Sequence, residues 1–158
     1  MDSEFNLTSD HGDLCGEKGV LGHSHLTHDG LIHVPLITYG LNNIAHQATN
    51  PVQHIDIMKT LISKAGLSNT QFQGRDLQTD RRDIAISQHL SASVDDDTVK
   101  NYEGILQYDP EFDVSDFHES LLTCARTPEF KLEYTEEFTR LYMLPDETRD
   151  VKSEYPGV

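Results

Sequence analysis

The order of hydrophobic and polar positions differs between the two halves of this chain. In the first half, Phe5–Thr8 predicts the end of a strand, and residues 32–39 predict a mostly buried strand bounded by Gly30 and Gly40. Because Pro35 has no backbone N–H to donate, this second strand should begin or be interrupted there. Strands that alternate with helical segments are typical of α/β folds.

One segment, residues 53–65, has the periodicity of an amphipathic helix. Asn50 is the predicted N-cap, Pro51 fits the first turn, and Gly66 should end the helix. Its apolar residues form one stripe at helical spacing: Ile55, Met58, Leu61, Ile62 and Ala65. We interpret this helix as structural.

The second half contains short apolar runs separated by polar stretches. These runs predict strands at residues 83–89, 119–126 and 130–134. Pro128 lies between two of them and predicts a hairpin over residues 126–131. Residues 91–118 are acidic and carry tyrosines, and we expect a long loop or an irregular excursion there. Residues 145–148 predict a turn that leads into a short terminal helix.

The candidate chemistry lies between residues 8 and 35. This segment begins T-S-D-H-G and ends G-H-S-H-L-T-H-D-G-L-I-H-V-P, which is rich in histidine. Asp10 and His11 are expected where a strand ends and a loop begins, the edge at which open α/β sheets bind ligands. A turn at Gly12 can bring a carboxylate oxygen and an imidazole nitrogen toward one metal ion. Taken alone, however, Asp-His-Gly is more often a simple polar turn.

Composition limits the classes of partner. The chain has 27 acidic and 12 basic residues and a formal charge of −15, which argues against binding to nucleic acid or to anionic membranes. Such an acid excess is expected of a protein that works at high salt, and we hypothesise a halophilic source. The length of 158 residues suits one modest domain, or a part whose core is completed by a missing region.

Other signals are weaker. No run of about 18 apolar residues predicts a membrane span, and the start M-D-S-E lacks the features of a signal peptide. We therefore expect a soluble protein, cytoplasmic by default. The two cysteines form neither a zinc pattern nor a disulfide framework. Cys15 is expected beside the candidate site, and Cys124 as a small buried residue of a strand.

Longer blocks of the sequence resemble the sulfatase family, within the alkaline-phosphatase-like superfamily. T-S-D-H-G-D-L-C-G-E-K-G, then G-H and H-V-P-L-I, is similar to the sulfatase blocks S-D-H-G, G-E-H-G, G-H or G-K, and R/H-V-P-L-I. V-Q-H-I-D-I-M-K-T-L-I-S-K-A-G-L and Q-G-R-D-L resemble the helix and the G-x-S/D-L segment that follow. R-T-P-E-F-K-L-E-Y and L-Y-M-L-P-D-E-T-R-D-V resemble blocks near the end of the family's sequences.

This resemblance implies a fold and a division of the chain. The implied class is α/β, with a partial alkaline-phosphatase-like sheet and a small C-terminal antiparallel sheet with a helix. Residues 1–80 are expected to form the C-terminal part of the catalytic α/β domain. Residues 81–158 are expected to form the antiparallel subdomain.

The sequence departs from the family at its beginning. Sulfatases carry, upstream of Asp-His-Gly, an Asp-Asp metal pair and a C/S-x-P/A-x-R segment whose Cys or Ser becomes the formylglycine nucleophile. Neither is present, since Cys15 is followed by G-E-K and Cys124 by A-R-T. The acidic run at residues 95–97 lies on the wrong side of the block, and we expect a solvated loop there. The resemblance implies the C-terminal part of a sulfatase, without its nucleophile and with half of its metal ligands.

The resemblance also assigns roles. Asp10 matches the family's metal carboxylate, and His11 the position that contacts the metal or the nucleophile; the implied ion is a hard divalent metal, with Ca²⁺ favoured. His23 matches the position of a catalytic group that protonates the leaving oxygen. Asp29 is expected to accept a hydrogen bond that shapes the loop, and His33 to make an orienting hydrogen bond.

The remaining basic residues of the segment are expected to have no catalytic role. We interpret His25 and His28 as polar loop residues and Lys18 as a solvated cation in a turn. No H-E-x-x-H pattern supports a zinc peptidase.

The implied function is hydrolysis of a sulfate ester, with the formylglycine supplied by a missing N-terminal segment or a partner chain. The 158 residues alone are then expected to be inactive. Two alternatives stay open: a phosphodiesterase or phosphotransferase of the same superfamily, and a non-catalytic metal-binding remnant.

Overall fold

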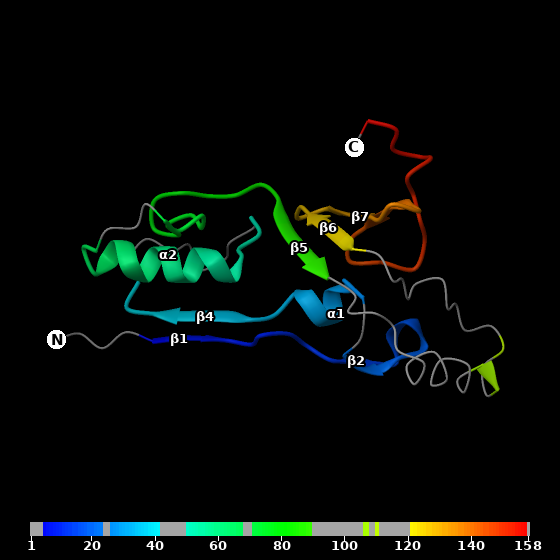
Figure 1. Ribbon diagram of the computed structural model, residues 1–158, viewed down its shortest axis with the longest axis horizontal. Coiled ribbons are helices and arrows are strands. Elements are labelled where there is room, and N and C mark those ends of the chain that lie inside the picture. Colours follow the sequence, from blue (N-terminus) through cyan, green and yellow to red (C-terminus); the bar gives the residue numbers. More distant parts are fainter. Residues whose placement is uncertain are drawn as a thin grey trace.

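The computed structural model describes residues 5–23, 26–41, 50–67, 71–89, 106–107, 110 and 121–157. Two antiparallel strands, β1 (Phe5–Thr8) and β4 (Leu36–Tyr39), run along one side of the molecule beneath a helix, α2 (His54–Lys64) (Figure 1). A four-stranded antiparallel sheet lies toward the other end. The α/β class with a small C-terminal antiparallel sheet is therefore confirmed.

The expected strand over residues 32–39 is divided. Its first part belongs to a single helical turn, α1 (Asp29–Ile32), and β4 begins at Leu36, directly after Pro35. The predicted interruption at the proline is thus confirmed. The predicted burial is wrong, because Ile37 and Tyr39 are exposed. Within the described residues β4 pairs only with β1, and the apolar side chains that lie opposite each other on the two strands, Phe5 with Tyr39 and Leu7 with Ile37, are exposed.

The pattern of hydrophobic positions did not predict the short hairpin that follows β1. β2 (Leu14–Cys15) and β3 (Leu21–Gly22) pair antiparallel across a 3-10 turn, η1 (Glu17–Gly19). Strands of two residues are too short to carry a detectable alternation. A small core of Leu14, Val20 and Leu31 packs this hairpin against α1.

Helix α2 lies where the sequence predicts, but its cap and its buried face differ. The N-cap is Gln53 rather than Asn50, in a capping box with Asp56. Two residues of the apolar stripe, Ile55 and Met58, are about half exposed, whereas Asp56 and Thr60 are buried. The helix therefore packs on the described part of the chain through polar residues.

Asp56 binds the loop that follows α2. Its carboxylate accepts hydrogen bonds from the backbone N–H groups of Gln53 and Arg75, both at 2.8 Å, and from Arg82 Nε at 2.8 Å. Gly74 allows this close approach, because a Cβ there would lie 2.0 Å from the Ile55 carbonyl oxygen. Burial raises the pKa of Asp56, but these hydrogen bonds hold it below its usual value.

The C-terminal sheet has the order β5-β6-β7-β8, with every neighbouring pair antiparallel. Its strands are β5 (Ala85–His89), β6 (Leu122–Arg126), β7 (Phe130–Tyr134) and β8 (Thr139–Met143). The first three agree with the predicted strands, and the predicted hairpin joins β6 to β7. β8 was not predicted.

The predicted terminal helix is absent from residues 148–157, which form turns. Their backbone is instead tied to β8, because Val151 N–H donates to the Leu141 carbonyl at 2.7 Å and Asp150 accepts from Leu141 N–H at 3.1 Å. The excursion expected over residues 91–118 lies almost wholly outside the described residues. The longest described helix, α2, has 11 residues, and no helix in the described ranges could cross a membrane. The domain boundary near residue 80 stays a prediction.

The contacts of Asp56 predict a specific loss of stability. Asp56→Asn should lower the free energy of unfolding at pH 7 by about 3 kcal/mol, because Arg82 then keeps a largely buried charge without its partner. The lowered pKa of Asp56 means that this stability is present above about pH 4, the unfolded value, and is lost as the pH falls through the folded value. Urea unfolding followed by circular dichroism, from pH 7 to pH 3, measures both effects.

Asp80→Asn is the matched control. Asp80 forms an exposed ion pair with Arg75 at 3.6 Å, so its loss should cost less than about 1 kcal/mol. Equal effects of the two substitutions would contradict the role given to Asp56.

The two cysteines should differ in reactivity. Cys124 lies within β6 with 0% of its surface exposed, as expected, and burial raises the pKa of its thiol to about 12. Cys15 is exposed. Iodoacetamide at pH 8 should therefore modify only Cys15 in the folded chain, as read by intact mass, and both residues in urea. The folded Cys15→Ser variant should stay unmodified; rapid modification of it would show that Cys124 is accessible.

Candidate functional site

Asp10 and His11 lie on the segment that connects β1 to β2. The Asp10 side chain is 88% exposed, and its Oδ1 accepts the backbone N–H of His11 at 3.0 Å, which lowers the pKa of Asp10. His11 Nδ1 lies 2.9 Å from the Gly12 carbonyl oxygen, and this contact raises the pKa of His11. A proton on Nδ1 leaves the lone pair of Nε2 available to a ligand.

Gly12 fixes this segment to α1. Its N–H donates to the Leu31 carbonyl at 2.9 Å, and a Cβ at this position would lie 2.1 Å from the Gly30 carbonyl oxygen. The turn predicted at Gly12 is absent, since residues 11–13 have no turn and the nearest bend is at Asp10; the glycine is required here by packing instead. His54, on α2, holds the same segment from the other side, since its Nε2 lies 2.8 Å from the Ser9 carbonyl oxygen.

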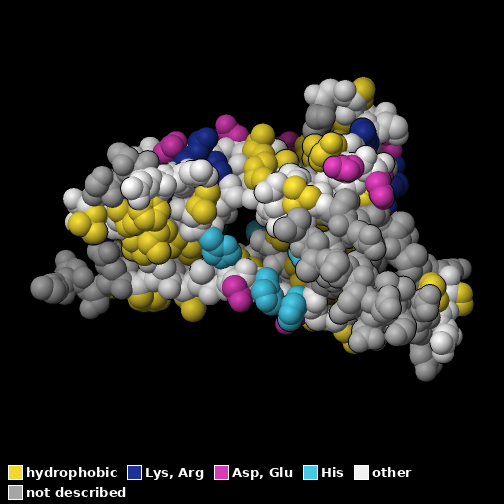
Figure 2. Space-filling view, in the orientation of Figure 1, with side chains coloured by type: hydrophobic (Ala, Val, Ile, Leu, Met, Phe, Trp, Pro, Cys, Tyr) yellow, Lys and Arg dark blue, Asp and Glu magenta, His cyan; other side chains and the backbone are white. Residues whose placement is uncertain are grey.

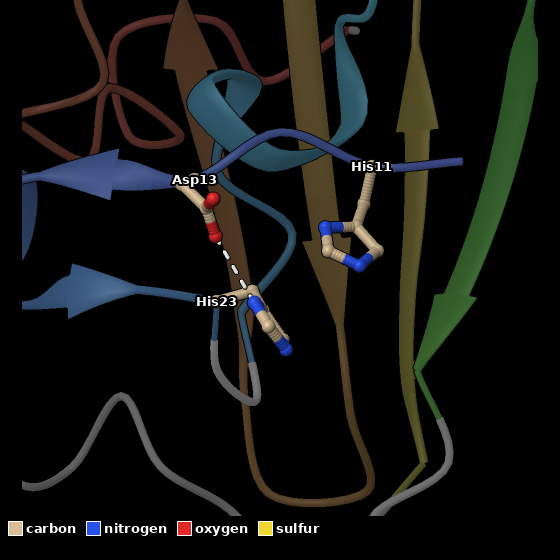
Figure 3. A group of neighbouring side chains, drawn as sticks. All are labelled: His11, Asp13 and His23. Carbon is tan, nitrogen blue, oxygen red and sulfur yellow. Dashed lines mark hydrogen bonds and ion pairs between the residues drawn. The ribbon is translucent and has the colours of Figure 1, made fainter. Parts of the chain in front are cut away.

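The hairpin β2–β3 brings His23 close to this segment. Leu14 pairs with Gly22, so Asp13 and His23 lie at the same end of the two strands, and His23 Nδ1 is 3.0 Å from Asp13 Oδ1. The rings of His11 and His23 are 4.4 Å apart between centroids. Figure 3 shows the three side chains gathered on one side of the segment that carries His11 and Asp13.

The structure therefore brings together His11, Asp13 and His23, with one ligand atom from each within 4.8 Å of the others. Sequence reasoning selected the two histidines and missed Asp13. Asp13 lies one residue before β2 and His23 one residue after β3, so only the pairing of these short strands makes them neighbours. Asp10 is outside this group, although its Oδ2 lies 3.8 Å from His11 Nε2.

The donors at Asp10 fit a calcium site in part. Calcium takes about six to eight oxygen ligands. Asp10 offers an ionised carboxylate that is open to solvent, but the imidazole of His11 is not an oxygen donor. The described residues at this position thus supply a fraction of a calcium shell.

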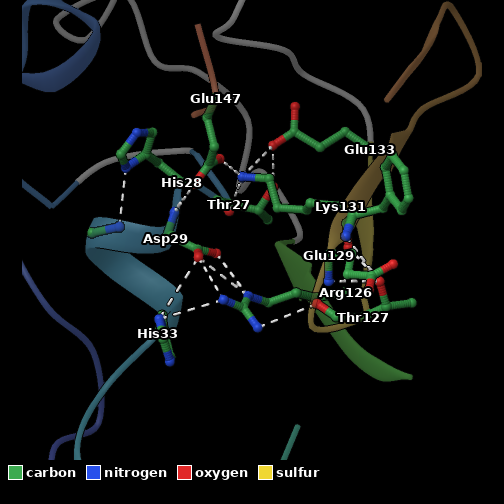
Figure 4. Close-up of polar contacts among 12 residues, drawn as sticks. Thr27, His28, Asp29, His33, Arg126, Thr127, Glu129, Lys131, Glu133 and Glu147 are labelled. Carbon is green, nitrogen blue, oxygen red and sulfur yellow. Dashed lines mark hydrogen bonds and ion pairs between the residues drawn. The ribbon is translucent and has the colours of Figure 1, made fainter. Parts of the chain in front are cut away.

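The loop around α1 is held by the C-terminal sheet. Arg126, on β6, donates to both carboxylate oxygens of Asp29, from Nε at 3.0 Å and from Nη2 at 2.8 Å (Figure 4). Burial raises the pKa of Asp29, but Arg126 more than offsets this and holds it below its usual value. His33 Nδ1 lies 3.4 Å from Arg126 Nη2. The hydrogen bonds predicted for Asp29 and His33 are therefore present.

A buried lysine makes a second contact between the C-terminal sheet and the loop around α1. Lys131, on β7, is fully buried and donates to the Thr27 carbonyl at 2.9 Å, beside Glu133 and Glu147. Glu133 accepts from the Thr27 hydroxyl at 2.7 Å, and Glu147 accepts the backbone N–H of Asp29 at 2.8 Å. We call these contacts, together with Asp29–Arg126, the loop–sheet network (Figure 4).

The other expected residues have local roles. His28 is the N-cap of α1 and accepts the Gly30 N–H at 3.0 Å; burial lowers its pKa, which favours the neutral ring that this contact requires. Lys18 lies in a turn, as expected, but its Nζ is 5.4 Å from the centre of the Tyr142 ring rather than fully solvated. His25 and the acidic run at residues 95–97 lie outside the described residues.

A large open cavity lies beside this site. Its volume is about 870 Å³, and it is lined by residues of the β1–β4 pair, α2, the loop after α2, β5 and the β6–β7 turn. Apolar side chains such as Ile37, Val52 and Ile86 line it together with Arg82 and Arg126. In Figure 2, hydrophobic side chains gather over the end that carries α2, and histidines lie beside a hollow near the middle.

Comparison with known proteins identifies the fold. No family model and no curated protein matches this chain. A crystal structure of a protein assigned as a sulfatase, from Bacteroides thetaiotaomicron VPI-5482, is similar over 97% of this chain and 32% of its own, with a TM-score of 0.66 and 18% identity. The structure of BT4656 with its substrate D-glucosamine-2-N,6-O-disulfate is similar over 96% and 31%, with a TM-score of 0.63 and 21% identity.

The chain therefore has a sulfatase-like fold, as its sequence blocks implied. It spans about a third of the length of these two structures. At this level of identity the similarity extends to the fold alone. The roles expected for Asp10, His11 and His23 stay predictions.

The close approach at Gly12 predicts the effect of one methyl group. Gly12→Ala should lower the free energy of unfolding by about 2 kcal/mol, because the added Cβ collides with the Gly30 carbonyl and forces the segment away from α1. Gly157→Ala is the control, since no atom lies within 4 Å of its Cβ. Urea unfolding measures both; a Gly12→Ala variant as stable as the control would refute the contact.

Proposed function

We propose that this chain is the C-terminal part of an enzyme that hydrolyses sulfate esters. One observation carries the proposal: a sulfatase-like fold covers nearly the whole chain, and the Asp-His-Gly segment and His23 meet at one exposed position of that fold. Both similar structures support the proposal, because the first is assigned as a sulfatase and the second is in complex with a sulfated sugar, its substrate.

In this proposal Asp10 and His11 support a divalent metal ion. Calcium, when bound, would neutralise the oxygens of the sulfate group. Asp10 suits the position because its carboxylate is ionised near neutral pH and open to solvent. The backbone N–H of His11 and the contacts of Gly12 hold the carboxylate in place. The proposal leaves the remaining oxygen ligands to other parts of the full protein and to water.

His23 is the proposed general acid. Its Nδ1 faces Asp13 at 3.0 Å, and this contact orients the ring so that Nε2 can carry a proton to the leaving oxygen. Both side chains are more than half exposed, so a substrate can reach them. The alternative in which the ring only stabilises the hairpin predicts no effect of His23 on the chemical step.

The nucleophile is proposed to come from the region that the two similar structures have in addition. A C/S-x-P/A-x-R segment is absent from the 158 residues. Six large hydrophobic residues on β1, β4 and α2 are about half exposed or more: Phe5, Leu7, Ile37, Tyr39, Ile55 and Met58. Exposed apolar surface of this kind is typical of an interface, and we propose that the nucleophile-bearing region packs there.

The activity of the chain tests this proposal. The 158-residue chain alone should not hydrolyse 4-methylumbelliferyl sulfate, because covalent catalysis and proximity are lost together with the nucleophile. The native polypeptide, isolated from its source cells with an antibody and sized by intact mass spectrometry, should be longer or carry a partner chain, and should hydrolyse the ester. Turnover by the chain alone would refute the assignment of the nucleophile.

Variants of the active species test the residues. Asp10→Asn and His23→Ala should each lower kcat at least about a hundredfold, whereas Asp83→Asn, an exposed carboxylate elsewhere, should not. A bis-nitrophenyl phosphate assay separates the alternatives. A preference for this diester would favour the phosphodiesterase reading, and no turnover of either substrate would favour a non-catalytic remnant.

A further inference from the structure

The side chains of His11, Asp13 and His23 lie together, and only His11 also belongs to the proposed calcium position. We propose that these three side chains bind a divalent transition-metal ion, for which Zn²⁺ is the simplest probe. One ligand atom from each residue lies within 4.8 Å of the other two. The site shares His11 with the Asp10–His11 position and differs from it in its other ligands, its donor chemistry and its preferred metal.

The fold brings these donors together before any metal arrives. Asp13 and His23 are held as neighbours by the pairing of β2 with β3. His11 and Asp13 flank Gly12, whose backbone is fixed to α1 by the hydrogen bond to Leu31 and by the close approach to Gly30. Metal binding therefore has to order side chains only, because strand pairing and the contacts of Gly12 already position the backbone that carries them.

The donor chemistry favours a transition metal over calcium. Two imidazoles and one carboxylate suit Zn²⁺, Ni²⁺, Co²⁺ and Cu²⁺, whereas Ca²⁺ selects oxygen. The contact of His11 Nδ1 with the Gly12 carbonyl fixes a tautomer that presents Nε2, an arrangement common among metal-binding histidines.

The distances between the three donor atoms are compatible with binding of one metal ion after side-chain rotation. Zinc bonds of about 2.0–2.1 Å in a tetrahedron place ligand atoms roughly 3.3 Å apart. Separations of up to 4.8 Å then need rotations of exposed side chains, and all three are exposed. Three protein ligands leave a fourth position open to water.

The proposed ion has a consequence for the reaction. An ion on the His23 imidazole would occupy a nitrogen that the ring needs for proton transfer, so the transition metal should inhibit the enzyme. This consequence rests on the proposed function, whereas the binding itself does not.

Calorimetric titration of the full chain with Zn²⁺ tests the site. One ion per chain should bind, and His11→Ala, Asp13→Asn and His23→Ala should each weaken this binding by about tenfold or more. One control should bind as the unchanged chain does. His33→Ala removes a histidine that is 65% exposed, close to the 67% of His23. Asp10→Asn should weaken binding less than Asp13→Asn does, because Asp10 contributes only its charge, with Oδ2 3.8 Å from His11 Nε2. Circular dichroism checks that each variant folds.

The outcomes separate the two positions. Loss of affinity in the Asp13 and His23 variants that exceeds any loss in Asp10→Asn, with excess Ca²⁺ unable to displace the zinc, supports the site. Absence of stoichiometric binding overturns it. Equal affinity of the Asp13 and His23 variants and the unchanged chain, or a loss in Asp10→Asn that Asp13→Asn does not share, also overturns it. Because the readout is binding alone, failure of the sulfatase assay leaves this result unaffected.

Discussion

The loop–sheet network is the interaction on which the rest of the site depends. Arg126 and Lys131, on neighbouring strands of the C-terminal sheet, bind residues around α1 that lie about a hundred positions earlier in the chain. Buried ion pairs of this kind contribute little net stability but penalise other arrangements, since each partner would keep a buried charge. The network holds α1 in place, and Leu31 of α1 binds the backbone of Gly12. Asp10 and His11 directly precede Gly12 and Asp13 follows it, so this contact positions all three side chains.

Acidic residues have two different uses in this chain. A few, such as Asp29, Asp56 and Glu147, are buried or nearly so, and each is paired with a cation or a backbone N–H. They replace hydrophobic contacts at places where two segments must meet in one arrangement. The 27 acidic residues outnumber the 12 basic residues and give the chain a formal charge of −15. The halophilic source inferred from this charge stays a prediction. Apolar residues of β1, β4 and α2 remain exposed at the same time, and it is here that the nucleophile-bearing region is proposed to pack.

Two metal positions of different chemistry are proposed at the exposed segment around Gly12. Asp10 offers oxygen to a hard ion, and His11, Asp13 and His23 offer nitrogen and oxygen to a softer one. His11 belongs to both sets, and His23 cannot hold an ion and transfer a proton through the same nitrogen. In these two proposals, occupancy by a transition metal would thus oppose the proposed reaction.

Local sequence signals determined much of this protein. Blocks in family order predicted the sulfatase-like fold, helical periodicity located α2, β-strand patterns located β1 and most of the C-terminal sheet, and the proline located the start of β4. Asp10, His11 and His23 were selected in the same way, and their roles stay predictions. Only the tertiary structure added Asp13, chose Gln53 over Asn50 as the cap, turned Asp56 inward, added β8 and replaced the expected terminal helix with turns. The reason is physical: these outcomes depend on strand pairing and on hydrogen bonds between separate segments, such as those of Asp56 with Arg75 and Arg82 and of Val151 with Leu141, which outweigh local propensity.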